Sequence, residues 1–113
     1  MMTKERFDIL RDEFLEKEAK ILYWKQGEYS SGDDALQNFR EVAQFTGLRP
    51  AEVALTYLLK HIQSIALAVR TQDYTWSWST KDGEGLKPRF SEARNYLLLL
   101  AACLEEEQQN ERV

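Results

Sequence analysis

Cysteine is nearly absent from this chain of 113 residues, which contains one, Cys103. A single cysteine excludes a disulfide within the chain and a zinc site built from cysteines, and it fits a reducing compartment. Long apolar runs are also missing, because the uncharged stretch from Tyr96 to Leu104 has nine residues and a membrane span needs roughly 18–20. The N-terminal sequence MMTKERFDILRDEF is charged every few residues, unlike a signal peptide. We therefore expect a cytoplasmic protein that does not contact the membrane.

Basic residues do not dominate the charge. The chain has 15 Lys and Arg against 19 Asp and Glu, for a net charge of -4, and its basic residues are scattered. General nucleic-acid binding is excluded on this ground, because it requires a basic patch or stripe. The sequence also lacks a P-loop, a G-x-G-x-x-G motif and a G-x-S-x-G motif. Its one histidine, His61, cannot form a conventional His/Cys metal site alone.

Apolar residues recur at helical spacing in four segments, separated by glycine, proline and serine. Gly47 is a typical residue just after a helix, and Pro50 is typical of a first helical turn, where Glu52 favours the positive helix end. Asp33 or Asp34 is a candidate N-cap for the second segment. The predicted helices cover residues 3–25, 33–46, 50–70 and 87–108.

The segment 71–86 has no helical pattern. Tyr74, Trp76 and Trp78 alternate with Thr and Ser, and Asp82-Gly83 favours a turn, so we predict an aromatic loop with at most a weak hairpin. The tail 105–113 is polar. The chain is therefore predicted to form one all-α domain over residues 1–113, a four-helix bundle-like fold with a long aromatic loop between the third and fourth helices.

The last predicted helix is apolar on two sides. Phe90, Ala93, Leu97, Leu100 and Leu104 share one face, and a largely opposite face carries Tyr96, Leu99 and Cys103. A helix that is apolar on both sides must be covered on both sides. We expect a homodimer through residues 87–108, and the alternative cover is the aromatic loop.

Four polar residues of the last two predicted helices are candidates for chemistry. Glu92 and Asn95 are one turn apart, so their side chains lie side by side. His61 falls between apolar positions with Lys60 at the margin, and it could carry a proton or donate to a phosphate. The alternatives are that Glu92 stabilises the first turn, that Asn95 bonds a neighbouring backbone group, and that His61 is a hydrogen-bonded core residue.

The stretch from Lys25 to Asp34 is the densest polar segment, and Asp34, Asn38 and Glu41 follow on one face of the second predicted helix. Carboxylates on facing helices are one way in which all-α enzymes hold Mg²⁺, which prefers oxygen ligands. The alternative is a helix cap followed by a solvated acidic face.

Three stretches resemble a known group of proteins: KQGEYSSGDDALQNF at 25–39, YLLKHIQSI at 57–65 and EARNYLLLL at 92–100. They are similar to small phage and prophage proteins related to the nucleotide-modification-associated, MazG-like helical domains. The resemblance implies a fold like that of the all-helical nucleoside triphosphate pyrophosphatases, which depend on Mg²⁺ and are usually dimeric or tetrameric. Those enzymes hold the metal with paired acidic motifs, whereas Glu92-x-x-Asn95 offers one carboxylate.

From these observations we predict a phage-type nucleotide-binding protein in the host cytoplasm, whose activity would be Mg²⁺-dependent nucleotide pyrophosphohydrolysis if it is an enzyme. The alternative is a non-enzymatic phage protein that inhibits a host or anti-phage defence factor, or that sequesters a signalling nucleotide. The expected nucleotide-binding residues are Lys25, Tyr29, Asn38, Lys60 and Asn95. The expected metal ligands are Asp33, Asp34 and Glu92, and the expected catalytic residues are His61 and Glu92.

Overall fold

A computed structural model describes residues 1–29, 32–80 and 84–111, with the backbone alone over 21–29. The described residues form four helices and no strand, which confirms the all-α prediction. The helices are α1 (Lys4–Tyr29), α2 (Gln37–Thr46), α3 (Pro50–Thr71) and α4 (Leu86–Glu111).

Local sequence explains where α2 ends and α3 begins. Gly47 has a left-handed backbone with φ 73°, and its N–H donates a hydrogen bond to the carbonyl of Ala43 at 2.9 Å. Pro50 is the first residue of α3, and the Glu52 carboxylate accepts a hydrogen bond from the backbone N–H of Arg49 at 3.1 Å. Both boundaries confirm the prediction from sequence.

Two other boundaries differ from the prediction. α1 continues through Gly27 to Tyr29 rather than ending at residue 25. α2 begins at Gln37 rather than at 33, because Asp34 organises a turn before it: its Oδ1 accepts from the N–H of Leu36 at 3.0 Å, and its carbonyl from the N–H of Gln37 at 3.2 Å. The predicted turn at Asp82-Gly83 lies outside the described residues.

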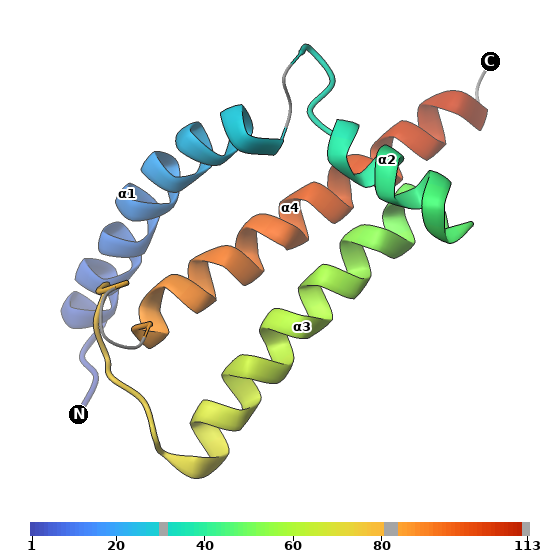
Figure 1. The fold of residues 1–113 in the computed structure, drawn as a ribbon. Coiled ribbons are helices and arrows are strands. Elements are labelled where there is room, and N and C mark those ends of the chain that lie inside the picture. Colours follow the sequence, from blue (N-terminus) through green and yellow to red (C-terminus); the bar gives the residue numbers. More distant parts are fainter. Residues whose placement is uncertain (30–31, 81–83, 112–113) are drawn as a thin grey trace.

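α4 lies in the middle of the molecule (Figure 1). α3 runs antiparallel along one side of α4, α2 crosses the end where α3 begins, and α1 lies on the other side of α4. The core fills the space between α2, α3 and α4. Its buried residues are Leu36, Phe39, Ala43, Ala51, Val53, Ala54, Leu58, Ala93, Tyr96 and Cys103.

The aromatic loop joins α1 to the beginning of α4. The Phe14 ring of α1 lies 4.9 Å from the Trp78 ring, and Trp76 meets Phe90 of α4 edge-on at 6.0 Å. Glu13 accepts hydrogen bonds from Trp78 Nε1 at 2.6 Å and from Lys87 Nζ at 2.9 Å. These two hydrogen bonds, together with the positive charge of Lys87, hold the pKa of the Glu13 carboxyl below its usual range.

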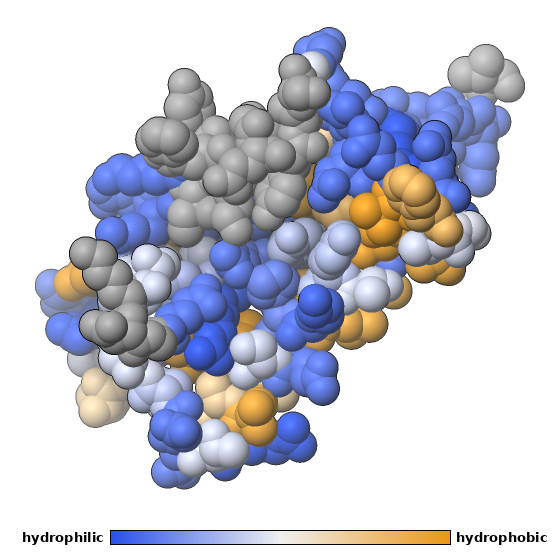
Figure 2. Space-filling model, viewed as in Figure 1, coloured by the Kyte–Doolittle hydropathy of each residue, from blue (hydrophilic) through white to orange (hydrophobic). Residues whose placement is uncertain are grey.

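Hydrophobic side chains remain at the surface. In Figure 2 they interrupt the polar surface around α2 and along α3. On α4, Tyr96 and Cys103 are buried against α3, whereas Leu97 and Leu104 are exposed. α4 is therefore apolar on two sides, as predicted, with one side uncovered. No helix in the described ranges combines the length and apolar character needed to cross a membrane.

Candidate functional site

A polar pocket of about 270 Å³ lies between α3 and the first turns of α4. Three of the predicted residues, Lys60, His61 and Glu92, line it. The other lining residues are Tyr57, Ser64, Glu84 and Arg89. The α3 residues lie on one side of the helix, because Tyr57 and Lys60 each precede another lining residue, His61 and Ser64, by four positions, and the two pairs are offset by three.

His61 and Glu92 face each other across the boundary between the two helices. Nδ1 of His61 lies 3.4 Å from Oε2 of Glu92, and both side chains are about three-quarters buried. The imidazole is stacked on the Tyr96 ring, with 5.0 Å between the ring centroids. Stacking on one side and a carboxylate at Nδ1 restrict the orientation of the imidazole, which is a suitable arrangement for donating a hydrogen bond or a proton to a ligand.

Arg89 supplies a second positive group at the pocket. Its guanidinium donates to Ser64 Oγ at 3.1 Å and to the carbonyl of Glu84 at 3.2 Å. These bonds fix a planar cation at the pocket wall, and Lys60 adds an exposed ammonium on the α3 side. Two cations of this kind suit a phosphate group, which an arginine can bind through two parallel hydrogen bonds.

Asn95 is buried one turn after Glu92, with 6% of its surface exposed. Its Oδ1 accepts no hydrogen bond from the described residues. A buried amide oxygen without a hydrogen-bond partner lowers the stability of the fold. The packing of α4 therefore does not explain why an asparagine stands at this position. The alternative that Asn95 bonds neighbouring backbone does not account for this oxygen.

Asp34 lies in a different part of the molecule. Its carboxylate accepts from Arg40 Nε at 2.6 Å, and Arg40 also binds both carboxylate oxygens of Glu106 near the end of α4. The hydrogen bonds from Arg40 hold the pKa of the Asp34 and Glu106 carboxyls below their usual values. The same bonds raise the pKa of Arg40, so this guanidinium stays charged.

The predicted residues therefore do not form one pocket. Glu106 lies 14 positions after Glu92 on the same helix, so the Asp34 cluster is about 21 Å along α4 from the polar pocket. Asp33 is exposed and Asn38 is half-buried on α2. The side chains of Lys25 and Tyr29 lie outside the described part of the chain.

The magnesium site predicted from Asp33, Asp34 and Glu92 does not fit this arrangement, because the carboxylates come from separate regions. Among the described residues, no group of three or more His, Cys, Asp and Glu side chains is placed to hold a metal ion. Glu84 and Glu92 do share the polar pocket. Magnesium commonly uses one or two carboxylates together with waters and substrate phosphates, and this pair could supply that number.

Four pocket residues were not among the predicted site residues: Tyr57, Ser64, Glu84 and Arg89. Tyr57, His61 and Ser64 follow each other at spacings of four and three, and Arg89 precedes Glu92 by three. Each of these spacings places side chains on one helix face. Helical spacing therefore groups Tyr57 and Ser64 with His61, and Arg89 with Glu92, whereas Glu84 precedes α4 and is indicated by no such spacing.

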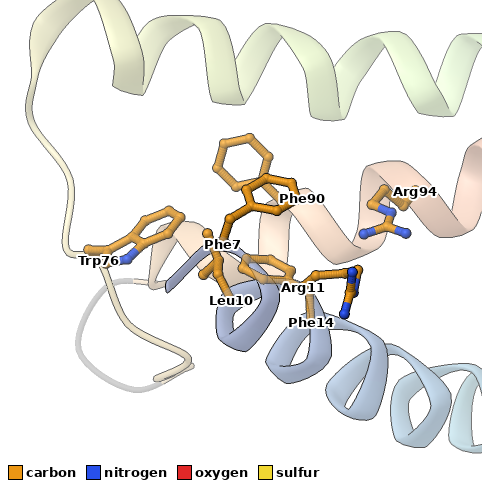
Figure 3. Close-up of a pocket in the computed structure, with 7 residues that line it drawn as sticks. All are labelled: Phe7, Leu10, Arg11, Phe14, Trp76, Phe90 and Arg94. Carbon is orange, nitrogen blue, oxygen red and sulfur yellow. The ribbon is translucent and has the colours of Figure 1, made fainter. Parts of the chain in front are cut away.

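A second pocket, between α1 and α4, has a different character. It has a volume of about 310 Å³, and its lining residues are Phe7, Leu10, Arg11, Phe14, Trp76, Phe90 and Arg94. Their side chains face one another from α1, from the aromatic loop and from α4 (Figure 3). The arginines at its edge are paired with acidic residues, Arg11 with Asp8 and Arg94 with Glu18. This groove is therefore a part of the packing of α1 on α4.

Comparison of the chain with family models, with curated proteins and with solved structures gave no match.

Proposed function

We propose that this protein binds a nucleotide, or a similar small molecule with a phosphate group, in the polar pocket between α3 and α4. The observation that carries this proposal is the placement of Lys60, His61 and Arg89 around one cavity. Lys60 and Arg89 supply positive charge for phosphate oxygens, and His61 supplies a hydrogen-bond donor held in place by Glu92 and Tyr96. The proposed ligand is a nucleotide because two of the three stretches that resemble MazG-like proteins, 57–65 and 92–100, contribute most of the residues that line this pocket.

The size of the pocket limits how much of a nucleotide it would hold. Pockets for drug-sized ligands are about 300–1,000 Å³, and this cavity of about 270 Å³ is slightly smaller. We expect the phosphate and sugar to lie inside and the base to extend past Tyr57 toward solvent. Tyr57 belongs to an aromatic cluster with Phe39 and Tyr96, at 6.1 and 5.8 Å, which holds its ring in place.

Hydrolysis remains a separate proposal. Of the three carboxylates predicted to bind the metal, Asp34 and Glu92 lie far apart, so one chain does not assemble the paired acidic motif of the MazG-like enzymes. Glu92, with Glu84, would hold a magnesium ion carried in by the phosphates. His61 would then act as a general acid that donates a proton to a group at the phosphate, or as a general base that accepts one from it. Binding does not depend on this step.

Isothermal titration with nucleoside mono-, di- and triphosphates, with and without Mg²⁺, tests the proposal. Lys60→Ala is expected to weaken binding by about tenfold, because a charge-assisted hydrogen bond to phosphate is lost. Arg70→Ala is the matched control, since it removes one positive charge from the same helix outside the pocket. An absence of binding to the whole panel, or equal losses in both variants, would exclude the pocket as a nucleotide site.

A second candidate function is that of a non-enzymatic interaction protein. It is favoured by the exposed apolar side chains on α3 and α4 and by the separation of Asp34 from Glu92. Mass spectrometry of the purified protein and of its denatured supernatant discriminates between the two. A bound phosphate compound favours nucleotide binding, whereas a host protein at equal stoichiometry with no small molecule favours the second candidate.

A further inference from the structure

Eight apolar residues, seven of them exposed and Ala66 half-buried, form a surface along α3 and α4, here named the outer apolar face. Its members are Leu55, Leu59, Ile62, Ala66, Val69, Leu97, Ala101 and Leu104. The five α3 residues span about 21 Å of helix with no polar residue among them. Leu97 is 52% exposed and Val69 is 57% exposed, so the fold of one chain leaves the face in water.

The helical geometry shows that both helices contribute to the same surface. The side of α3 that packs against α4 is here named the contact line. Each α3 member of the outer apolar face comes one residue after a position on this line, as Leu59 follows the buried Leu58 and Val69 follows the buried Ala68. On α4, Leu97 follows Tyr96 and Leu104 follows Cys103 in the same way. One residue is a rotation of about 100°. α3 and α4 are antiparallel neighbours (Figure 1). The rotation therefore turns both sets of residues to the same side of the pair.

The surface area of the chain is larger than one folded monomer of this mass should expose. A 13.3 kDa monomer exposes about 6,500 Å², whereas this chain exposes 8493 Å². Its radius of gyration is 16.3 Å, against about 13 Å for a compact domain of this length. The excess of about 2,000 Å² is consistent with a chain that has left one side of its core uncovered.

We infer that a second copy of this chain covers the outer apolar face. If half of the excess were buried on each of two chains, the interface would total about 2,000 Å², which lies within the range of obligate homodimers. A twofold contact buries the same patch on both copies, and this face carries no charge that would oppose itself. The interface combines α3 and α4, rather than residues 87–108 alone, and Leu99 is packed in the core rather than in the interface.

The polar pocket stays open in this dimer. Its α3 residues Tyr57, Lys60 and Ser64 lie on the flank of α3 opposite to the outer apolar face, since they are rotated the other way from the contact line. The inference is therefore independent of the proposed nucleotide binding.

Leu97→Glu tests the inference with a matched control in the next residue. Leu97→Glu places a carboxylate in the interface, so we expect dimerisation to weaken by about 100-fold or more. Leu98→Glu makes the same change at a residue that is 58% exposed and a further 100° round α4, outside the face, and the dimer should persist. Sedimentation velocity over a range of concentrations measures both, and circular dichroism checks that the helices are retained.

The wild-type chain provides a second measurement that needs no variant. If folding is coupled to dimerisation, the urea midpoint rises with protein concentration. A wild-type monomer whose midpoint does not change with concentration would overturn the inference. A dimer that is weakened equally by Leu97→Glu and Leu98→Glu would also overturn it, because the interface would then lie elsewhere.

Discussion

His61 Nδ1 and Glu92 Oε2 lie 3.4 Å apart across the boundary between α3 and α4, in a pocket that also holds Lys60 and Arg89. The carboxylate orients the imidazole, but it also places a negative charge where a phosphate would bind. A magnesium ion between Glu92 and the phosphate would relieve that repulsion. If the pocket binds a phosphate compound, as proposed, the charge of Glu92 favours a ligand that binds together with a metal ion.

Replacement of Glu92 by Gln is expected to separate these cases. Without Mg²⁺, Glu92→Gln should tighten phosphate binding by about threefold to tenfold, because a like charge is removed. Any increase in affinity that Mg²⁺ produces in the wild type should disappear in the variant. Titration calorimetry in both buffers measures this, with Glu105→Gln as a control on the exposed side of α4. Weaker binding in both buffers would contradict this expectation and show that the Glu92 carboxylate supports binding, either by direct contact or by orienting His61.

Much of the helical framework could be predicted because its causes are local. Gly47 and Pro50 end and begin helices through their own backbone preferences, and the structure confirms both. Lys60, His61 and Glu92 reach one pocket because α3 and α4 are antiparallel neighbours along most of their length. Two long apolar helices that follow each other in the chain, joined by one loop, are typical of such an antiparallel pair.

The position of Asp34 could not be predicted in the same way. Its carboxylate looks like a metal ligand in the sequence, but in the structure it is held by Arg40, which is six positions away, and through Arg40 to Glu106. The pairing of Arg40 with Glu106 depends on the angle at which α2 crosses the end of α4, and that angle is set by packing over the whole core. Helical periodicity contains no information about it.

Arg40 is expected to stabilise the fold in a pH-dependent way. Arg40→Met removes the ion pairs with Asp34 and Glu106, so it should lower the free energy of unfolding near pH 7. The expected loss is only about 1 kcal/mol, because the paired side chains are a third or more exposed and solvent screens their charges. Urea unfolding of both proteins between about pH 2 and pH 8 measures the difference. Arg70→Met, which removes a surface arginine from α3, is the control.

The sign of this pH dependence follows from the pKa shifts. Arg40 holds the folded-state pKa of Asp34 and Glu106 below the ordinary values of 3.8 and 4.5. The stabilisation is therefore fully present above those ordinary values and is lost as the pH falls through the lower folded-state values. A difference between wild type and variant that stays constant down to about pH 2 would show that the arginine stem, rather than its charge, stabilises the contact.

Phe14 is expected to anchor α1. Its side chain is 8% exposed and contacts the rings of Trp76 and Trp78, whereas Leu15 is 47% exposed. Phe14→Ala should lower the free energy of unfolding by about 3 kcal/mol, because it leaves a cavity at the base of the groove in Figure 3. Leu15→Ala should change it by less than about 0.5 kcal/mol. Urea unfolding followed by tryptophan fluorescence measures both, and equal losses would contradict this role for Phe14.

Cys103 is expected to report on the contact between α3 and α4. Its side chain is 2% exposed within the core, and burial, followed by the nearby Glu106 carboxylate, raises the pKa of the thiol. Because the thiolate is the reactive form, both burial and the raised pKa slow modification at neutral pH. We expect an alkylating reagent to label the native chain at least about 100-fold more slowly than the same chain in urea, since labelling must await opening of the core. Fast labelling of the native chain would contradict this expectation, because it would mean that the part of α4 around Cys103 opens readily from the core.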